Sequence, residues 1–256
     1  MKPVLLLDNV TVQFGGLKAV SDVTFSVGER ELFGLIGPNG AGKTTVFNII
    51  TGVYRPTGGR ITFDGKSVAG QKPYSITARG IARTFQNIRH FGSMSVLDNV
   101  RCACNMHLNH GVSHALWRGK KVATEERDIE GRVMELLGIF GLAAERDSSC
   151  KSLPYGAQRR LEIVRALATR PKLLLLDEPA AGMNPTEKVE LMKLIRFTQE
   201  KFGLAVLLVE HDMKVVMGIC QRINVLDYGR KIAEGTPAEI QRDPNVIAAY
   251  LGTDED

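Results

Sequence analysis

Short apolar runs alternate with amphipathic stretches along the second half of the chain. The apolar runs at 173–177 and 205–209 predict buried strands, and a helix is expected between them from Thr186 to Lys201. The same reasoning predicts further helices at 155–169 and from Asp212, further strands at 223–226 and 231–233, and two short helices at 237–251. Strands that alternate with helices of this length predict a parallel sheet with right-handed crossovers.

The first third of the chain has a different pattern. Residues 4–14 and 23–27 alternate or run apolar, which predicts two strands. Two further β segments are expected at 60–63, before the hairpin signal Asp64-Gly65, and at 81–86. We therefore expect an antiparallel β piece at the N-terminus, next to a mostly parallel core.

The middle of the chain has helical rather than β periodicity. From about 96 to 144 the apolar spacing is helical, most clearly at 125–137, while 105–121 is rich in His, Gly and Lys and is expected to be a surface loop. We expect one α/β domain over 1–256, with a core of about 1–90 and 166–256 and an inserted helical lobe of about 91–165.

A glycine-rich segment follows an apolar run at 32–36 and precedes a short apolar helix. It reads Gly37-Pro38-Asn39-Gly40-Ala41-Gly42-Lys43-Thr44-Thr45. These residues match the phosphate-binding loop pattern G-x-x-x-x-G-K-[ST] at every fixed position. Its glycines let the backbone point N–H groups at anionic oxygens, and the helix N-terminus favours anions. Lys43 would reach the β- and γ-phosphates, and Thr44 would offer its hydroxyl to Mg²⁺.

The alternative for this segment is a glycine-rich turn with an exposed lysine. The strand before it and the helix after it favour the phosphate loop. We therefore predict a P-loop NTPase core that binds a nucleoside triphosphate.

Acidic residues end the apolar strand at 173–177. Such a strand delivers carboxylates to the carboxyl edge of a parallel sheet, where α/β folds bind ligands. Asp177 is expected to hold Mg²⁺ beside Thr44, and Glu178 to accept a proton from an attacking water or to orient it. The alternative is a surface Asp-Glu turn before a proline.

Two polar residues at other strand ends are further candidates. Gln86 could contact the water shell of the metal ion and couple the nucleotide state to the helical lobe, although a strand-end glutamine is often simply solvated. His211 could bond the γ-phosphate and the Glu178 side chain, positioning the water without being the base. The alternative for His211 is a histidine at a helix start that is satisfied by backbone groups.

The composition excludes several classes of protein. The net charge of +5 comes from scattered Lys and Arg without a basic run, so no nucleic-acid partner is expected. The four cysteines have no C-x-x-C spacing and are expected to be reduced thiols of a cytosolic protein. No secretory signal or membrane-spanning run is found, so other subunits would hold the protein at any membrane where it works.

Residues 153–167 complete an ordered set of motifs. The set comprises Phe14 before the first glycines, the phosphate loop, Gln86, Leu153-Pro154-Tyr155-Gly156-Ala157-Gln158, Asp177-Glu178, a loop at 181–185 and His211. With these motifs in this order, essentially the whole chain resembles the ATP-binding subunit of ABC transporters. Within that family it is most similar to the branched-chain amino acid import ATPases, on the segments 14–17, 83–87, 178–185 and 210–213 and on the tail from Asn245 to Gly252.

The resemblance implies how the protein works. It implies an ATPase that powers import of branched-chain amino acids, with ATP and Mg²⁺ bound between two subunits arranged head to tail. Tyr155 and Gly156 of one subunit would then cap the phosphates held by the other, and Phe14 would stack on adenine. Permease subunits would hold the dimer peripherally at the cytoplasmic face of the plasma membrane, and a periplasmic or extracellular solute-binding protein would act indirectly.

The chain departs from the family pattern at three positions. Pro154 stands where the family usually has Ser, so one hydroxyl and one N–H donor are missing, although proline is acceptable at a helix start. Ala157 stands where Gln is common, and Asn184 where Asp is frequent in the wider family. We therefore expect a weakened signature, which a different partner ATPase could complement.

Other functions remain open at this level. The nucleotide motifs suit an ABC ATPase with another cargo, such as urea or amides, or one for lipid or lipopolysaccharide export. Residues 91–150, where a permease helix would dock, should distinguish these cases. A soluble ABC-type regulator is a further alternative, but such proteins generally carry two ATPase halves or long coiled-coil insertions.

Overall fold

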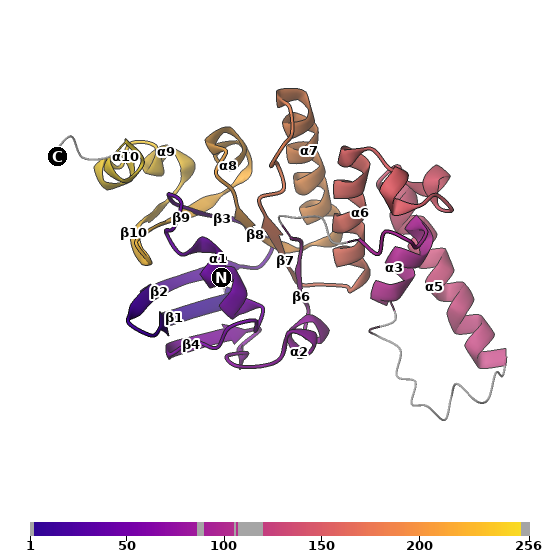
Figure 1. Ribbon diagram of the computed structural model, residues 1–256, viewed down its shortest axis with the longest axis horizontal. Helices are drawn as coiled ribbons and strands as arrows, with labels where there is room; N and C mark the ends of the chain where they lie inside the picture. The colour runs from indigo at the N-terminus through magenta and orange to yellow at the C-terminus, as the bar shows by residue number, and fades with distance from the viewer. Residues whose placement is uncertain (1–2, 86–89, 105, 107–119, 252–256) are drawn as a thin grey trace. The chain divides into compact units, whose positions relative to one another are not determined.

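A computed structural model describes residues 3–85, 90–104, 106 and 120–251 (Figure 1). The chain divides into two compact units, one of residues 1–86 and 172–256 and one of residues 87–171. The sequence predicts boundaries between core and lobe near residues 90 and 165, and these boundaries remain a prediction.

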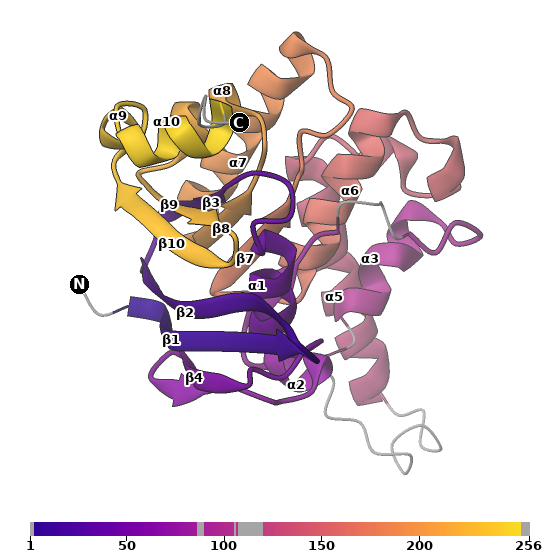
Figure 2. The same cartoon turned by 60° about the vertical axis from the view of Figure 1, so that its left-hand side comes forward.

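The N-terminal part of the first unit is an antiparallel sheet. Its strands are β1 (Pro3–Phe14), β2 (Leu17–Gly28), β4 (Gly58–Phe63) and β5 (Lys66–Ser67), in the order β2-β1-β4-β5. Figure 2 shows β1 between β2 and β4. The expected antiparallel piece is thus confirmed, but β2 begins six residues before the predicted strand at 23–27. The apolar pattern does not predict this extension, because polar Ser21 and Asp22 interrupt it. Asp22 takes a left-handed conformation at an irregularity in the β1–β2 register.

The larger sheet has six strands. They are β3 (Leu32–Ile36), β6 (Ile81–Arg83), β7 (Leu173–Asp177), β8 (Ala205–Val209), β9 (Arg222–Asp227) and β10 (Arg230–Gly235), in the order β10-β9-β3-β8-β7-β6. Every pair from β9 to β6 is parallel, and β10 pairs antiparallel with β9. All residues of β3, β7 and β8 are buried, as expected for parallel strands covered on both faces.

Helices connect the strands of this sheet. They are α1 (Lys43–Ile50) after β3, α2 (Pro73–Ala78) before β6, α7 (Pro185–Phe202) before β8, α8 (Met213–Ile219) before β9, and α9 (Pro237–Ile240) and α10 (Pro244–Leu251) at the end. The helix predicted at 186–201 agrees with α7 within one residue at each end. Asn184 and Glu187 form a capping box at its start, and Gly203 ends it in the left-handed conformation. The short helix α2 was not predicted.

The second unit is helical over its described residues. It contains α3 (Val96–Cys104), α5 (Lys120–Ile139) and α6 (Tyr155–Ala168), together with the 3₁₀ turns η2 (Ala143–Glu145) and η3 (Cys150–Ser152). The loop predicted at 105–121 is too long by two residues, because α5 already begins at Lys120. In the part of the chain that the structure describes, no helix is long and apolar enough to cross a membrane.

A buried ion pair joins β6 to β7. Arg83 Nη2 lies 2.7 Å from Asp177 Oδ2, and the two side chains are 9% and 8% exposed. The same guanidinium donates through Nη1 to Asn48 Oδ1 of α1 at 2.7 Å. It also lies over the ring of Phe47, 5.4 Å from the ring centre. Arg83 therefore connects the end of β7 to the helix that follows β3.

Strand β6 is shorter than predicted. The predicted strand extended to residue 86, but β6 stops at Arg83. Thr84 still bonds to β7, since its N–H donates to Leu175 O at 2.9 Å and its Oγ1 accepts from Asp177 N at 3.4 Å. Gln86 lies outside the described residues.

We expect Arg83→Met to lower the free energy of unfolding by about 3–5 kcal/mol, because it leaves the Asp177 carboxylate buried without its partner. Urea denaturation at neutral pH measures this loss. The matched control is Lys172→Met, which removes an ion pair of 2.6 Å whose side chains are 61% and 52% exposed, and should cost no more than about 1 kcal/mol. Equal losses in the two variants would contradict a structural role for the buried pair.

Candidate functional site

The segment between β3 and α1 has the backbone that a phosphate loop requires. Gly37, Gly40 and Gly42 have φ values of 150°, 82° and 98°. A Cβ at Gly37 would lie 2.1 Å from the Leu226 carbonyl oxygen, and one at Gly42 would lie 2.7 Å from that of Ala19. Glycine is therefore needed at both positions, whereas a Cβ at Gly40 would meet no described atom within 4 Å. Gly40 is the point at which the loop is open to a ligand.

The helix that follows this loop offers hydrogen-bond donors. Val46 N donates to Gly42 O at 3.0 Å, which starts the helical pattern. The N–H groups of Lys43, Thr44 and Thr45 precede that first bond and have no acceptor within the helix. Gly42, the cap residue, has no side chain to accept from them. The helix start is therefore suited to bind an anion.

Lys43 occupies the interior of the loop. Its Nζ donates to Gly37 O at 2.6 Å and to Pro38 O at 2.8 Å. Burial lowers the pKa of this ammonium, and the negative charge of Glu178 acts in the opposite direction. An incoming phosphate would offer the ammonium a charged acceptor in place of two carbonyl oxygens.

The acidic residues at the end of β7 have different surroundings. Asp177 is buried and bonded to Arg83. Glu178 takes a left-handed conformation, with φ 45°, and its N–H donates to Val209 O at 2.9 Å. Its Oε2 lies 3.4 Å from His211 Nδ1. The prediction that His211 lies beside Glu178 agrees with this distance.

A buried carboxylate next to His211 was not among the predicted site residues. Glu210 is fully buried and accepts hydrogen bonds from the N–H groups of Ala180, His211 and Asp212 at 2.7, 3.1 and 3.4 Å. Burial raises its pKa, and these three hydrogen bonds oppose the shift. Glu210 thus connects the loop after Glu178 to the loop that carries His211. In the sequence, its position directly after the apolar strand β8, equivalent to that of Glu178 after β7, was the available signal.

A pocket of about 410 Å³ brings most of the predicted residues together. Its lining comprises Leu17, Lys18, Ala19, Asn39, Gly40, Ala41, Gly42, Lys43, Thr44, Thr45, Glu178 and Tyr228. The loop, its lysine, both threonines and the acidic residue Glu178 therefore face one space. Sequence reasoning missed Leu17 to Ala19 and Tyr228, since apolar and turn residues carry no motif.

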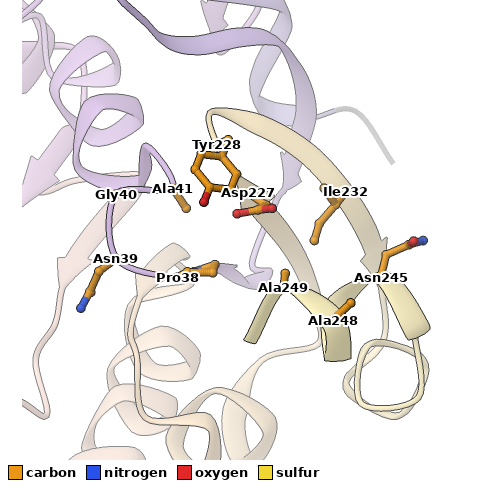
Figure 3. A pocket seen from close by; sticks show the side chains of 10 residues that line it. All are labelled: Pro38, Asn39, Gly40, Ala41, Asp227, Tyr228, Ile232, Asn245, Ala248 and Ala249. Atoms are coloured by element: carbon orange, nitrogen blue, oxygen red, sulfur yellow. The ribbon is translucent and has the colours of Figure 1, made fainter. Parts of the chain in front are cut away.

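A second hollow of about 580 Å³ also borders the loop. It is lined by Pro38, Asn39, Gly40, Ala41, Asp227, Tyr228, Ile232, Asn245, Ala248 and Ala249 (Figure 3). It is larger, but neither Lys43 nor Thr44 lines it. Since both residues line the smaller pocket, that pocket is the better candidate for the phosphates.

Several of the predicted residues that the structure describes are not part of the smaller pocket's lining, among them Gly37, Pro38, Asp177 and His211. Among the described residues, Phe14 is not part of the smaller pocket's lining, and its ring instead meets Tyr54 edge-on, with ring centres 5.1 Å apart. Tyr155 and Gly156 form the first turn of α6 in the second unit. Pro154 is the cap residue of that helix and provides no side-chain hydrogen bond.

Two of the predicted residues offer oxygen donors of the types that Mg²⁺ accepts. Thr44 is exposed at the pocket and offers a hydroxyl. Asp177 offers a carboxylate at the end of β7, but it is buried against Arg83 and is not part of the pocket's lining. Within the described residues, no cluster of three or more His, Cys, Asp or Glu could hold a metal ion by itself. A cation here would therefore complete its shell with water and phosphate oxygens, as Mg²⁺ does in nucleotide sites.

The sequence matches two family descriptions. The family described as ABC transporter matches residues 20–181, and the one described as branched-chain amino acid ATP-binding cassette transporter matches residues 230–256.

Two curated relatives match nearly the whole chain. The high-affinity branched-chain amino acid transport ATP-binding protein BraF of Pseudomonas aeruginosa is 44% identical over 251 residues, which cover 98% of both chains. The lipopolysaccharide export system ATP-binding protein LptB of Escherichia coli is 34% identical over 250 residues, again 98% of both chains.

Solved structures agree with these relatives and with the expected fold class. The ADP conformation of MJ1267, an ATP-binding cassette of an ABC transporter, matches with a TM-score of 0.85 at 30% identity and covers 99% of this chain and 100% of its own. The dimeric post-hydrolysis state of the cassette MJ0796, bound to ADP and Pi, matches with a TM-score of 0.75 at 25% identity and covers 91% and 98%. The chain therefore belongs to the ABC transporter family, as an ATP-binding and ATP-hydrolysing subunit.

Proposed function

We propose that this ATPase hydrolyses ATP in the 410 Å³ pocket, with Glu178 as the residue that activates water. The observation that carries the proposal is that Glu178 lines the same space as Lys43 and Thr44, while its carboxylate also lies 3.4 Å from His211. A carboxylate there faces the end of the site where the terminal phosphate would be attacked.

The other residues of the site are proposed to bind the phosphates and to orient the attacking water. The N–H groups at the start of α1 and the Lys43 ammonium would hold the phosphates and stabilise the charge that develops during transfer. The pairing of His211 with Glu178 would position the water. Glu210 supports both residues, because its carboxylate fixes the backbone N–H of Ala180 and of His211.

Thr44 and Asp177 are the residues proposed to hold Mg²⁺, and Gln86 is proposed to reach its water shell. When bound, the ion would neutralise part of the charge on the phosphate oxygens. Phe14 remains a proposed adenine contact, which requires its ring to leave or share its contact with Tyr54.

The ATPase is proposed to work as a head-to-tail dimer. Tyr155 and Gly156 open a helix whose first N–H groups could cap the terminal phosphate held by another subunit. A Cβ at Gly156 would meet no described atom within 4 Å, so packing within the chain does not require glycine there. Close approach of a ligand from another subunit is a reason for it. Because Pro154 provides no hydroxyl, a partner ATPase of different sequence is a second candidate for the other half of the dimer.

We expect Glu178→Gln to lower the rate of ATP hydrolysis about a hundredfold or more, because the amide cannot accept the proton of the attacking water. ATP binding should persist, since the loop and Lys43 are untouched. Release of phosphate and binding of a fluorescent ATP analogue measure the two properties. The control is Glu190→Gln, which changes an exposed carboxylate that pairs with Lys193 at 2.9 Å. Hydrolysis by Glu178→Gln at the control's rate would reject this role.

The proposed cargo is a branched-chain amino acid, imported through permease subunits that hold the ATPase at the cytoplasmic face of the membrane. Support comes from the 44% identity to BraF and from the family match at 230–256. The 34% identity to LptB keeps lipopolysaccharide export as the second candidate, and the difference in identity favours import.

The test is to purify the ATPase from membranes with its partner subunits and reconstitute the complex in vesicles. Leucine, isoleucine or valine, with the solute-binding protein, should stimulate ATP hydrolysis severalfold over the rate without solute. Urea and lipopolysaccharide serve as competing cargoes in parallel samples. Stimulation by either of these but not by the amino acids, or purification of the chain without any membrane partner, would reject the import assignment.

A further inference from the structure

Tyr228 is an exposed aromatic residue in a constrained turn. It lies between β9 and β10, and its ring is open to solvent, since the residue is 87% exposed. Its φ is 40° and that of Gly229 is 76°, so two consecutive residues adopt the left-handed conformation of a tight hairpin. A tyrosine is a poor choice for such a position on steric grounds. Neither core packing nor turn geometry therefore explains this side chain.

The turn that carries Tyr228 is fixed to the phosphate loop. Gly229 N donates to Ala41 O at 3.1 Å, and Ser21 N donates to Gly229 O at 2.8 Å. A Cβ at Gly229 would lie 2.6 Å from Ala19 O, so the backbone of the turn packs closely against β2. The position of Tyr228 relative to the loop is therefore set by backbone contacts on both sides.

The lining of the 410 Å³ pocket has two chemically different parts. One part is the phosphate loop with Lys43, whose donors suit a triphosphate. The other part is Leu17, Lys18, Ala19 and Tyr228. Because the phosphates of ATP would occupy the first part, its ribose and base must leave along the second. Tyr228 is the aromatic member of that second part.

Tyr228 also lines the 580 Å³ hollow beside the loop. Figure 3 shows its ring between Asp227 and Ala41, at the margin of the loop. Tyr228 is therefore a lining residue of both hollows. By contrast, Phe14 has its ring against Tyr54 and does not belong to the described lining.

We propose that Tyr228 binds the nucleoside end of ATP, with its ring against the base or ribose; this rests on the proposed function, which places the phosphates at Lys43. A ring face is suited to this task because it contacts a nucleobase without requiring hydrogen bonds. Its fixed turn means that little freedom is lost when the nucleotide binds.

The test uses Tyr228→Asn, because asparagine tolerates the left-handed conformation and so preserves the turn. The dissociation constant for ATP should rise about fivefold, and KM should rise more than kcat falls, since the lost contact is made on binding. Competition by inorganic tripolyphosphate, which has no nucleoside, should be the same in the variant and the unaltered protein. Tyr228→Phe, which keeps the ring, should bind ATP within about twofold of the unaltered protein.

Three outcomes would overturn the assignment. Unaltered ATP affinity in Tyr228→Asn would show that the ring makes no contact. An equal loss of tripolyphosphate binding would show that the residue acts on the loop and not on the nucleoside. A loss of ATP affinity in Phe14→Ala, with none in Tyr228→Asn, would place the base on Phe14. If the unaltered protein bound neither ATP nor tripolyphosphate, the proposed function itself would fail, which is a separate result.

Discussion

The backbone of residues 37–45 is the constraint on which the rest of the site depends. A Cβ at Gly37 would lie 2.1 Å from the Leu226 carbonyl, and Ala41 O accepts the Gly229 N–H at 3.1 Å. The loop is therefore held by the end of β9 and by the turn after it, about 190 residues away in sequence. This contact presents the N–H groups of α1 to one pocket and leaves the ammonium of Lys43 inside the loop. The roles proposed for the other site residues all depend on where this loop holds the phosphates.

Two polar contacts bring the acidic groups to the same edge of the sheet. Arg83 fixes the Asp177 carboxylate and reaches α1 through Asn48. Glu210 fixes the backbone beyond Glu178 and the backbone of His211. Asp177 is the last residue of β7, and Glu210 directly follows the neighbouring parallel strand β8. The carboxyl ends of parallel strands are where α/β folds collect ligand-binding groups. The buried pair orients the carboxylate that is proposed to face the metal, and the buried Glu210 orients the residues proposed to face the water.

Sequence patterns predicted the sheet and the phosphate loop because both depend on local rules. Apolar runs predicted β3, β7 and β8, and the helix predicted at 186–201 matches α7. Arg83, Glu210 and Tyr228 could not be assigned in this way, because their partners lie far away in the chain. The expected adenine contact of Phe14 came from resemblance alone, and the ring lies against Tyr54. Sequence patterns do not determine which side chains, far apart in the chain, line the same pocket.

The most direct test asks which N–H groups ATP protects. Hydrogen exchange of the purified protein, measured by mass spectrometry with and without MgATP, separates the two hollows beside the loop. Binding in the smaller pocket predicts slower exchange of peptides that cover residues 42–45 and 178, with little change at 244–251. Slower exchange over α10 (Pro244–Leu251), with none at 42–45, would place the ligand in the larger hollow and contradict phosphate binding beside Lys43 and Glu178.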